Sequence, residues 1–182
     1  MDETPDAPED ATELVVLLDD AGAPVGTAPK ATVHGADTPL HLAFSCFIHD
    51  GAGRVLLTRR ALAKRTWPGV WTNSVCGHPG PGEDFAAAIV RRCADELGCL
   101  VTEITEVLPD FRYRAIDASG TVENEVCPVF TARLDGDVRA RAEEVMDFAW
   151  LEPAALTRAL EAAPFAFSPW LVLEWAQLAA GE

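Results

Sequence analysis

The sequence predicts a single α/β domain, an α/β/α sandwich built around a mixed β-sheet. The chain has 182 residues, which is the usual size of one domain. Hydrophobic residues make up 49% of it and charged residues 24%, proportions typical of a globular protein. Segments with the pattern of strands outnumber those with the pattern of helices, and the helical segments are interleaved among them. That order favours a sheet covered by helices on both faces.

The N-terminus predicts a tail rather than a leader or an anchor. Residues 1–11 hold five acids and two prolines, so we expect a disordered acidic tail there and one folded domain over residues 12–182. The start of the chain lacks the basic and apolar regions of a signal peptide, and no apolar run approaches the roughly 18 residues of a membrane span. We therefore expect a soluble, cytoplasmic protein.

Alternation and turn residues predict strands in the first half of the domain. An apolar run bounded by acids predicts a strand over residues 13–19. Residues 41–49 alternate between the two faces of a strand, and a glycine-containing turn joins them to a second strand over residues 55–59. A further strand is expected over residues 71–76, because a loop rich in glycine and proline follows it.

The second half of the domain predicts three helices around three strands. The pattern over residues 84–97 is helical and ends at Gly98, and Ser168 and Pro169 are typical of the start of the last helix. We expect strands over residues 104–116, 121–134 and 145–151. We expect helices over residues 84–97, 154–162 and 169–180.

The charge of the chain is negative overall but locally positive. A formal net charge of −15 argues against a nucleic-acid partner, since such proteins need a basic surface. Residues 54–82 nevertheless contain five basic residues and no acid: Arg54, Arg59, Arg60, Lys64 and Arg65. This stretch is either a binding surface for a small anion or a solvated basic loop.

Five scattered cysteines exclude two common kinds of site. No two of them form a CxxC pair, so a zinc ribbon or a thioredoxin-like site is not expected. An odd number of cysteines in a chain without an export signal also argues against a disulfide framework. Most should be small core residues, and one could serve as a nucleophile or a base.

The helix over residues 84–97 carries charges on its apolar side. At about 100° per residue, Phe85, Ile89, Cys93 and Leu97 form one stripe, with Glu96 inside it and Arg92 at its edge. Burying a carboxylate is costly unless it is paired or holds a cation. Glu96 therefore either pairs with Arg92 one turn away or lies at a site where it holds a cation.

Two more groups of residues could bind metal. Glu123 and Glu125 lie two residues apart on a strand, so both project from one face. They either share a cation or proton or lie on a solvated face. Three of the four histidines lie in or beside patterned segments: His34, His41 and His78. Three imidazoles and two carboxylates suit manganese, zinc, iron or magnesium, although a lone histidine is often structural.

Several motifs together identify a family. They are His41-Leu-Ala-Phe-Ser45, Arg59-Arg-Ala61, Trp67-Pro-Gly-Val-Trp71, Thr72-Asn-Ser-Val-Cys-Gly-His-Pro79, Phe111-Arg-Tyr-Arg114, Glu123-Asn-Glu-Val-Cys-Pro128 and Phe167-Ser-Pro-Trp170. From about residue 13 to residue 175 the chain resembles type 1 isopentenyl-diphosphate isomerase, a family with the Nudix fold. The resemblance implies that the protein interconverts isopentenyl diphosphate and dimethylallyl diphosphate for isoprenoid biosynthesis.

A degenerate Nudix box runs from Gly77 to Gly98. A hydrolytic box would have glutamate where this chain has Arg92 and Asp95, which weakens the alternative of a Nudix diphosphate hydrolase. A non-catalytic binding module is a third interpretation, and the presence of Cys76 with the two strand glutamates argues against it.

The resemblance implies a role for each matched residue. Cys76 looks like the catalytic cysteine, and Glu125 looks like its acid/base partner. The family's divalent-metal site is matched by His34, His41, His78, Glu123 and Glu125, and could hold Mn²⁺, Zn²⁺ or Mg²⁺. Glu96 and the backbone carbonyl of Cys76 resemble a second site, where Mg²⁺ bridges to the diphosphate.

The remaining matched residues would contact the substrate. The diphosphate would be bound by Lys30, Arg60, Lys64 and Arg92, and the hydrocarbon by Tyr113 and Trp170. The implied partner is a small diphosphate, with no nucleic acid and no membrane, and the implied state is a monomer.

Overall fold

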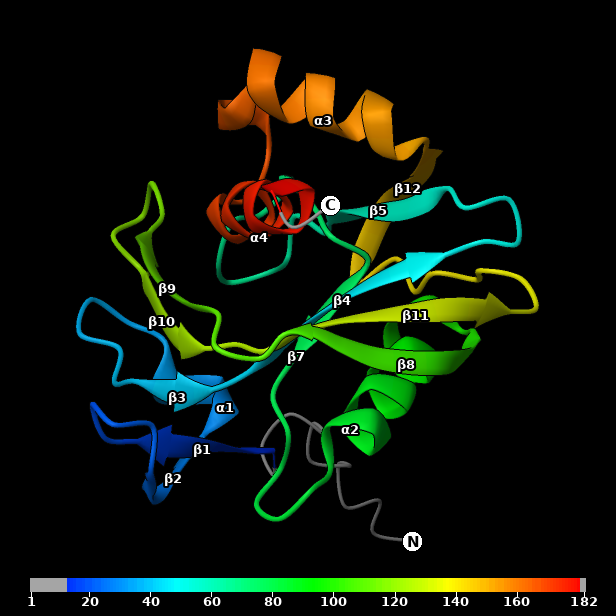
Figure 1. The fold of residues 1–182 in the computed structure, drawn as a ribbon. Coiled ribbons are helices and arrows are strands. Elements are labelled where there is room, and N and C mark those ends of the chain that lie inside the picture. The colour runs from blue at the N-terminus through cyan, green and yellow to red at the C-terminus, as the bar shows by residue number, and fades with distance from the viewer. Residues whose placement is uncertain (1–12, 181–182) are drawn as a thin grey trace, which may run out of the picture.

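Two mixed β-sheets form the centre of the protein (Figure 1). We describe a computed structural model, which covers residues 13–180, so the predicted acidic tail lies outside the described residues. The first sheet has the strand order β2-β1-β3-β10-β9. Its strands are β1 (Leu14–Leu18), β2 (Pro24–Pro29), β3 (His41–Leu42), β9 (Arg112–Ile116) and β10 (Val122–Val126).

The second sheet is larger and has the order β12-β5-β4-β11-β8, with two short strands beside this path. Its strands are β4 (Phe44–His49), β5 (Val55–Arg60), β6 (Trp71–Thr72), β7 (Val75–Gly77), β8 (Leu100–Leu108), β11 (Val129–Asp135) and β12 (Val145–Leu151). The helices are α1 (Lys30–Val33), α2 (Phe85–Arg92), the π-helical turn η2 (Cys93–Leu97), α3 (Pro153–Ala162), the 3₁₀ turn η3 (Pro164–Ala166) and α4 (Pro169–Ala180).

Helices cover both faces of the second sheet, as an α/β/α sandwich requires (Figure 1). Alternate side chains of β4 separate the two cores. Phe44 and Ile48 pack with Ile89 of α2, whereas Phe47 packs with Leu171 of α4 and Leu156 of α3. The predicted fold class, a single α/β domain, is confirmed. No helix among residues 13–180 is long and apolar enough to cross a membrane.

Long strands expected from the sequence are divided between the sheets. The segment predicted as one strand over residues 121–134 forms β10 in the first sheet and β11 in the second. Pro128 lies between them, and proline cannot donate a hydrogen bond to a strand ladder. The predicted strand over residues 104–116 likewise divides into β8 and β9. A turn that includes Pro109 separates them.

Two elements near the N-terminus were not predicted. β2 is an edge strand that begins and ends with proline, a composition that argues against a central strand. The four residues of α1 are too few to show a helical period. α1 begins at Lys30 and is followed by His34, and both residues line the cavity described below.

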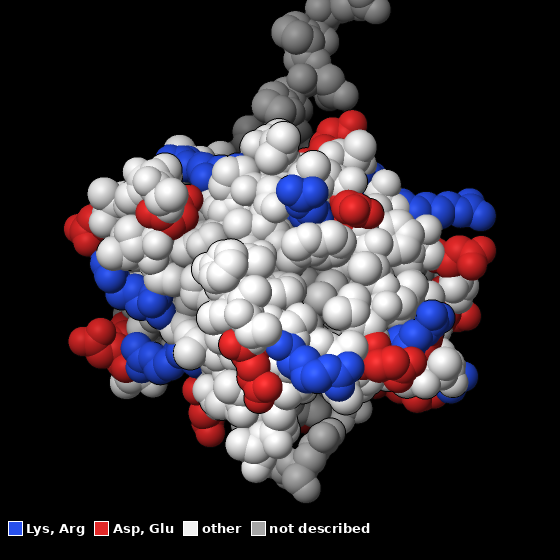
Figure 2. Space-filling model, turned by 90° about the horizontal axis from the view of Figure 1, so that it is seen from above, with Lys and Arg blue, Asp and Glu red and all other residues white. Residues whose placement is uncertain are grey.

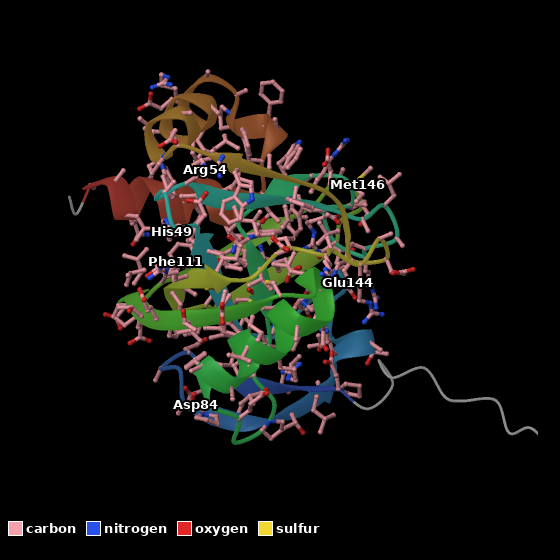
Figure 3. All side chains as sticks on the ribbon, turned by 90° about the vertical axis from the view of Figure 1, so that its right-hand side faces the viewer. His49, Arg54, Asp84, Phe111, Glu144 and Met146 are labelled. Atoms are coloured by element: carbon pink, nitrogen blue, oxygen red, sulfur yellow. The ribbon has the colours of Figure 1, made fainter. Side chains whose placement is uncertain are left out.

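The expected helix over residues 84–97 is helical along its length but changes its winding. Asp84 caps it by accepting hydrogen bonds from the backbone N–H groups of Ala86 and Ala87 (Figure 3). α2 then passes into η2, which ends at Gly98 with φ 56°. A side chain on Gly98 would place its Cβ 2.7 Å from the carbonyl oxygen of Arg139, so this position requires glycine.

Candidate active site

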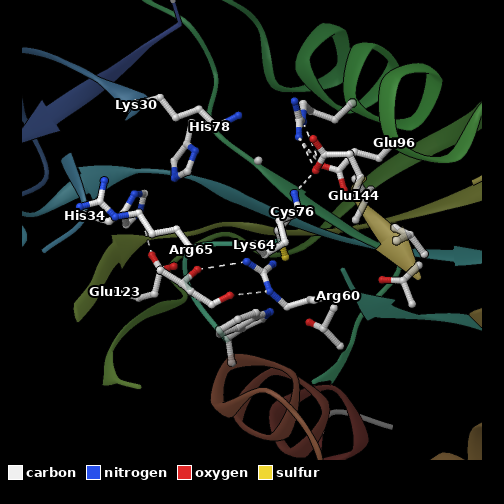
Figure 4. A pocket seen from close by; sticks show the side chains of 18 of the residues that line it. Lys30, His34, Arg60, Lys64, Arg65, Cys76, His78, Glu96, Glu123 and Glu144 are labelled. Carbon is white, nitrogen blue, oxygen red and sulfur yellow. Dashed lines mark hydrogen bonds and ion pairs between the residues drawn. The ribbon is translucent and has the colours of Figure 1, made fainter. Parts of the chain in front are cut away.

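A cavity of about 490 Å³ is lined by residues of both sheets and of α1, α2, η2 and α4 (Figure 4). It contains twelve of the thirteen residues that the sequence indicated: Lys30, His34, Arg60, Lys64, Cys76, His78, Arg92, Glu96, Tyr113, Glu123, Glu125 and Trp170. The thirteenth, His41, is fully buried and contacts His78 and Glu125.

Strand register brings the polar centre of the cavity together. Glu125 on β10 pairs in register with His41 on β3 and with Tyr113 on β9. Side chains of paired residues project to the same face of a sheet. Since Glu123 and Glu125 are each only 6% exposed, the alternative of a solvated strand face is wrong.

Three histidines and Glu125 converge on one point. The ligand atoms of His34, His41, His78 and Glu125 all lie within 4.8 Å of one another. The Nε2 atoms of His41 and His78 are 3.2 Å apart, and they lie 3.4 and 3.2 Å from the same oxygen of Glu125. The Nδ1 of His41 lies 2.9 Å from the carbonyl oxygen of Pro39, and donation there would leave its Nε2 free as a ligand.

This cluster fits a divalent cation. Buried polar atoms normally have hydrogen-bond partners. Among the described residues, however, neither the Nε2 of His34 nor the Oε2 of Glu123 forms a hydrogen bond of acceptable geometry. The two atoms are 3.0 Å apart, so Glu123, which is not among the four converging ligands, adjoins the cluster through His34. Imidazole nitrogens and carboxylate oxygens are the donor set expected for manganese, zinc or magnesium.

Glu125 is held in its charged form. Burial disfavours the carboxylate, but hydrogen bonds from His41 and His78 outweigh that effect and keep the pKa of Glu125 well below its usual range. The hydroxyl of Tyr113 donates a 2.9 Å hydrogen bond to the other carboxylate oxygen. Burial and the neighbouring Glu125 raise the pKa of Tyr113 well above its usual value, so the phenol keeps its proton.

Cys76 is the partly exposed cysteine of the chain, whereas the other four are buried in the core. Its thiol donates a 3.1 Å hydrogen bond to the side-chain oxygen of Asn73. Burial raises the pKa of the Cys76 thiol, and Arg60 acts in the opposite direction. In the view of Figure 4, Cys76 lies between the histidine side of the cavity and Glu96.

Ion pairs line the side of the cavity opposite the histidines. Arg92 pairs with Glu96, so the ion pair predicted within the helix is present, and both residues also line the cavity. The ammonium group of Lys64 pairs with Glu144, which Figure 4 shows beside Glu96. Gly77 makes room for Arg92, because a Cβ there would lie 2.9 Å from the Cγ of Arg92.

The basic stretch over residues 54–82 divides between cavity and surface. Arg60, Lys64 and Arg65 line the cavity, whereas Arg54 pairs with Asp50 at the end of a hairpin. Figure 2 shows that on the α3 side of the molecule both signs of charge surround a largely uncharged centre. Of this basic stretch, Arg60, Lys64 and Arg65 are therefore the residues that an anion bound in the cavity could meet.

Aromatic rings form the apolar wall. The indole of Trp170 packs 5.7 Å from the ring of Tyr113 and 5.3 Å from that of Trp67, measured between ring centres. The guanidinium of Arg60 lies over the Trp170 ring at 5.6 Å. An apolar group bound here would meet aromatic faces, while an attached anion would meet Arg60.

Several residues of the site carried no recognised signal in the sequence. Glu13 pairs with Lys30 and with Arg91, and Glu144 pairs with Lys64. Glu13 and Glu144 lie far from their partners in sequence, so no local pattern could have linked them. Glu174 had a visible signal, since it is a single acid within the apolar helix over residues 169–180.

Comparisons with known proteins agree with this geometry. Residues 39–173 match the NUDIX domain family. The isopentenyl-diphosphate Delta-isomerase of Paenarthrobacter aurescens is 63% identical over 168 residues, which cover 92% of this chain and 91% of that protein. The isopentenyl-diphosphate Delta-isomerase of Agromyces mediolanus is 59% identical over 93% of this chain and 82% of that protein.

A solved structure agrees at the level of the fold. DR0079 of Deinococcus radiodurans superposes with a TM-score of 0.69 at 19% identity, covering 91% of this chain and 98% of that one. The predicted Nudix architecture is thereby confirmed. With a matching domain over most of its length and relatives at about 60% identity, the chain belongs to the isopentenyl-diphosphate Delta-isomerase family of NUDIX domain proteins.

Proposed function

We propose that this protein interconverts isopentenyl diphosphate and dimethylallyl diphosphate by adding a proton at C4 and removing one from C2. One observation carries the proposal: a cysteine, a carboxylate paired with tyrosine, an aromatic wall and several cations all line a single cavity. An allylic shift needs two acid/base groups and no external oxidant. Both acid/base groups would belong to the single domain that we assign to residues 12–182.

Cys76 and the Glu125–Tyr113 pair are the proposed acid/base groups. In the direction that forms dimethylallyl diphosphate, the proton of the Tyr113 hydroxyl would pass through Glu125 to C4, and Cys76, once its thiol proton has left, would accept a proton from C2. The hydrogen bond from Tyr113 to Glu125 supports this assignment, because the phenol proton lies beside the carboxylate that would pass it to C4. One proton enters and one leaves, so the substrate's charge is unchanged.

The aromatic wall would protect the intermediate. Adding a proton to the alkene develops positive charge at C3, which water would trap. Trp170 is 2% exposed and Tyr113 9% exposed, so their buried rings limit access by water. The electron-rich face of an indole stabilises a nearby cation.

The cations would bind the diphosphate. Lys30, Arg60, Lys64 and Arg92 surround the cavity, and a diphosphate would compete with the carboxylates that now pair with three of them. We propose that Glu96 and the backbone carbonyl of Cys76 would hold Mg²⁺, which would offset the negative charge of the bound diphosphate.

We further propose that His34, His41, His78, Glu123 and Glu125 hold a second divalent ion, Mn²⁺, Zn²⁺ or Mg²⁺. When bound, this ion would make the proton donor beside it more acidic. We also propose a cytoplasmic monomer. One chain supplies every residue assigned to the cavity, and five free thiols suit a reducing compartment. The chain's strong negative charge favours a small anion over nucleic acid as its partner.

The decisive experiment is incubation of the purified protein with isopentenyl diphosphate and Mg²⁺ in deuterated water. We expect dimethylallyl diphosphate with deuterium in a methyl group, because the C4 proton would come from a solvent-exchangeable group. Release of phosphate or diphosphate would support the hydrolase alternative instead. Substrate recovered unchanged and unlabelled in the presence of metal would favour a binding module.

A further inference from the structure

Glu174 of α4 is a buried carboxyl group that the proposed mechanism does not use. Its side chain is fully buried, and its Oε1 has no hydrogen-bond partner among the described residues. Its Oε2 accepts a 2.9 Å hydrogen bond from the hydroxyl of Ser45 on β4. Such a group is costly to bury, so a role is expected for it.

A chain of buried hydrogen bonds leads from Glu174 to Cys76. The side-chain nitrogen of Asn73 donates to the Ser45 hydroxyl at 2.6 Å, so the Ser45 hydrogen is available for Glu174. The Asn73 oxygen in turn accepts from the Cys76 thiol at 3.1 Å. Ser45 and Cys76 are also paired in register between β4 and β7.

The same chain reaches the aromatic wall. The indole N–H of Trp170 donates to the Asn73 oxygen at 3.0 Å, so one amide oxygen contacts both the proposed acid/base cysteine and the ring at the apolar wall. Since an indole nitrogen only donates, this contact fixes which end of the Asn73 amide faces Cys76. Trp170 and Glu174 lie one turn apart on α4, and the bond from Glu174 to Ser45 ties that helix to the sheet that carries Cys76.

We propose that Glu174 is a positioning residue for the isomerisation: through Ser45 and Asn73 it fixes Cys76 and Trp170 relative to each other. The inference rests on the proposed function for its effect on turnover. Burial raises the pKa of Glu174 well above its usual value, in agreement with a neutral group that acts through hydrogen bonds. A neutral amide of the same shape should therefore replace it.

The test compares Glu174→Gln, Glu174→Leu, Ser45→Ala and the double variant Glu174→Leu/Ser45→Ala. Misplacing a reacting group lowers turnover by about ten- to a hundredfold, so we expect a kcat loss of that size in Glu174→Leu with KM little changed. Glu174→Gln should retain kcat within about threefold of the wild type. The double variant should be no worse than the poorer single variant, since both changes interrupt one chain.

A second readout is independent of turnover. Because the other four cysteines are buried, iodoacetamide should react with Cys76 alone in the folded protein, as mass spectrometry would verify. We expect faster alkylation of Cys76 in Glu174→Leu and Ser45→Ala, since a thiol released from Asn73 turns toward the cavity. Leu160→Ala is the control for a general loss of stability, because it removes a buried side chain from the hydrophobic core that also contains Trp170 of α4. This variant should leave the alkylation rate of Cys76 unchanged.

Wild-type kcat and alkylation rate in Glu174→Leu would overturn the proposal, as would losses that multiply in the double variant. Glu174→Gln as poor as Glu174→Leu would also overturn it. If Glu174→Leu does not fold, Ser45→Ala is judged by the same two measurements. If the wild type does not isomerise its substrate, the proposed function fails, and the alkylation rates still decide whether Glu174 positions Cys76.

Discussion

At the scale of single residues, the site depends on buried polar groups, only some of which have hydrogen-bond partners among the described residues. Glu125 receives hydrogen bonds from Tyr113 and a histidine, so its charge is tolerated where an isolated carboxylate would not be. Glu123, two residues away, has an oxygen without an aligned partner. The two carboxylates therefore have different environments and should respond differently to substitution.

Replacing Cys76 should remove the reaction but not the fold. A positioned acid/base group contributes about 10²- to 10⁴-fold to a rate, so Cys76→Ser should lower kcat by at least that factor. Cys93 is the matched control, because it is fully buried in the core beneath α2. Cys93→Ala should lower the melting temperature and retain turnover. Turnover measured beside thermal unfolding distinguishes the roles, and near-normal activity in Cys76→Ser would refute its assignment.

Substitution to glutamine should separate the two strand carboxylates. Glu125→Gln keeps the shape and a ligand oxygen but loses the base, so we expect bound metal to remain while turnover collapses. Glu123→Gln should weaken metal binding first, and excess metal should partly restore its activity. Metal content by elemental analysis, measured beside kcat, tests both expectations. The paired-carboxylate site is wrong if neither change alters metal content and Glu125→Gln keeps its turnover.

At the scale of elements, the change from α2 to η2 determines where charged residues lie. A π turn widens the winding, so positions read from a regular helical wheel drift after Arg92. Arg92 and Glu96 are nevertheless both about nine-tenths buried and border the cavity. Gly98, in the left-handed region, ends this turn.

Gly98→Ala should destabilise the protein without touching the cavity. A left-handed conformation costs a non-glycine residue roughly 1–2 kcal/mol, and the new Cβ would also crowd the backbone at Arg139. For a domain of this size we expect a fall in melting temperature of about 4 °C or more. Gly51→Ala is the control, since nothing lies within 4 Å of a Cβ there. Equal melting temperatures for the two variants would contradict the expected backbone strain at position 98.

The basic loop after β5 should act on substrate binding. Lys64→Ala removes a charge that would contact the diphosphate in both the ground state and the transition state, so KM should rise by about tenfold with a smaller change in kcat. Added salt should weaken binding less in this variant than in the wild type. Arg54→Ala, in the same basic stretch but paired at the surface, should leave KM unchanged. An unchanged KM in Lys64→Ala at low salt would mean that Lys64 does not contact the substrate and that the loop is a solvated basic loop.

At the scale of the whole molecule, local sequence patterns predicted the individual helices and strands better than the division of the strands between two sheets. The last helix over residues 169–180 has the predicted bounds, because a cap, a proline and an apolar run all lie in one short segment. The division of long segments between two sheets was not predicted. It depends on pairings such as β4 with β11, which join residues more than 80 positions apart.

The same reasoning explains what could be predicted of the site. Motifs indicated Cys76 and the strand glutamates, since each lies in a short distinctive stretch. The partnership of Ser45 with Glu174 spans 129 positions and left no pattern in either segment. Glu174 could only have been noticed as an acid inside an apolar helix.

The metal cluster spans the two sheets, and this predicts its effect on stability. His41 and Glu125 belong to β3 and β10 of the first sheet, whereas His78 follows β7 of the second. A bound ion would therefore join the sheets and stabilise only the folded chain, by about 2.7 kcal/mol at a hundredfold excess over Kd. We expect a chelator to lower the melting temperature by about 5–10 °C, and added Mn²⁺ or Zn²⁺ to restore it.

Two histidine variants make this expectation specific. His34→Ala removes a ligand and should abolish most of the metal-dependent shift, whereas His49→Ala, outside the cluster, should retain it. The metal-free protein should still fold, because the two hydrophobic cores that flank the second sheet do not include the histidine cluster. A melting temperature unaffected by chelation, in a protein shown to have contained the ion, would mean that the metal does not link the sheets. An equal shift in both histidine variants would place the stabilising ion elsewhere.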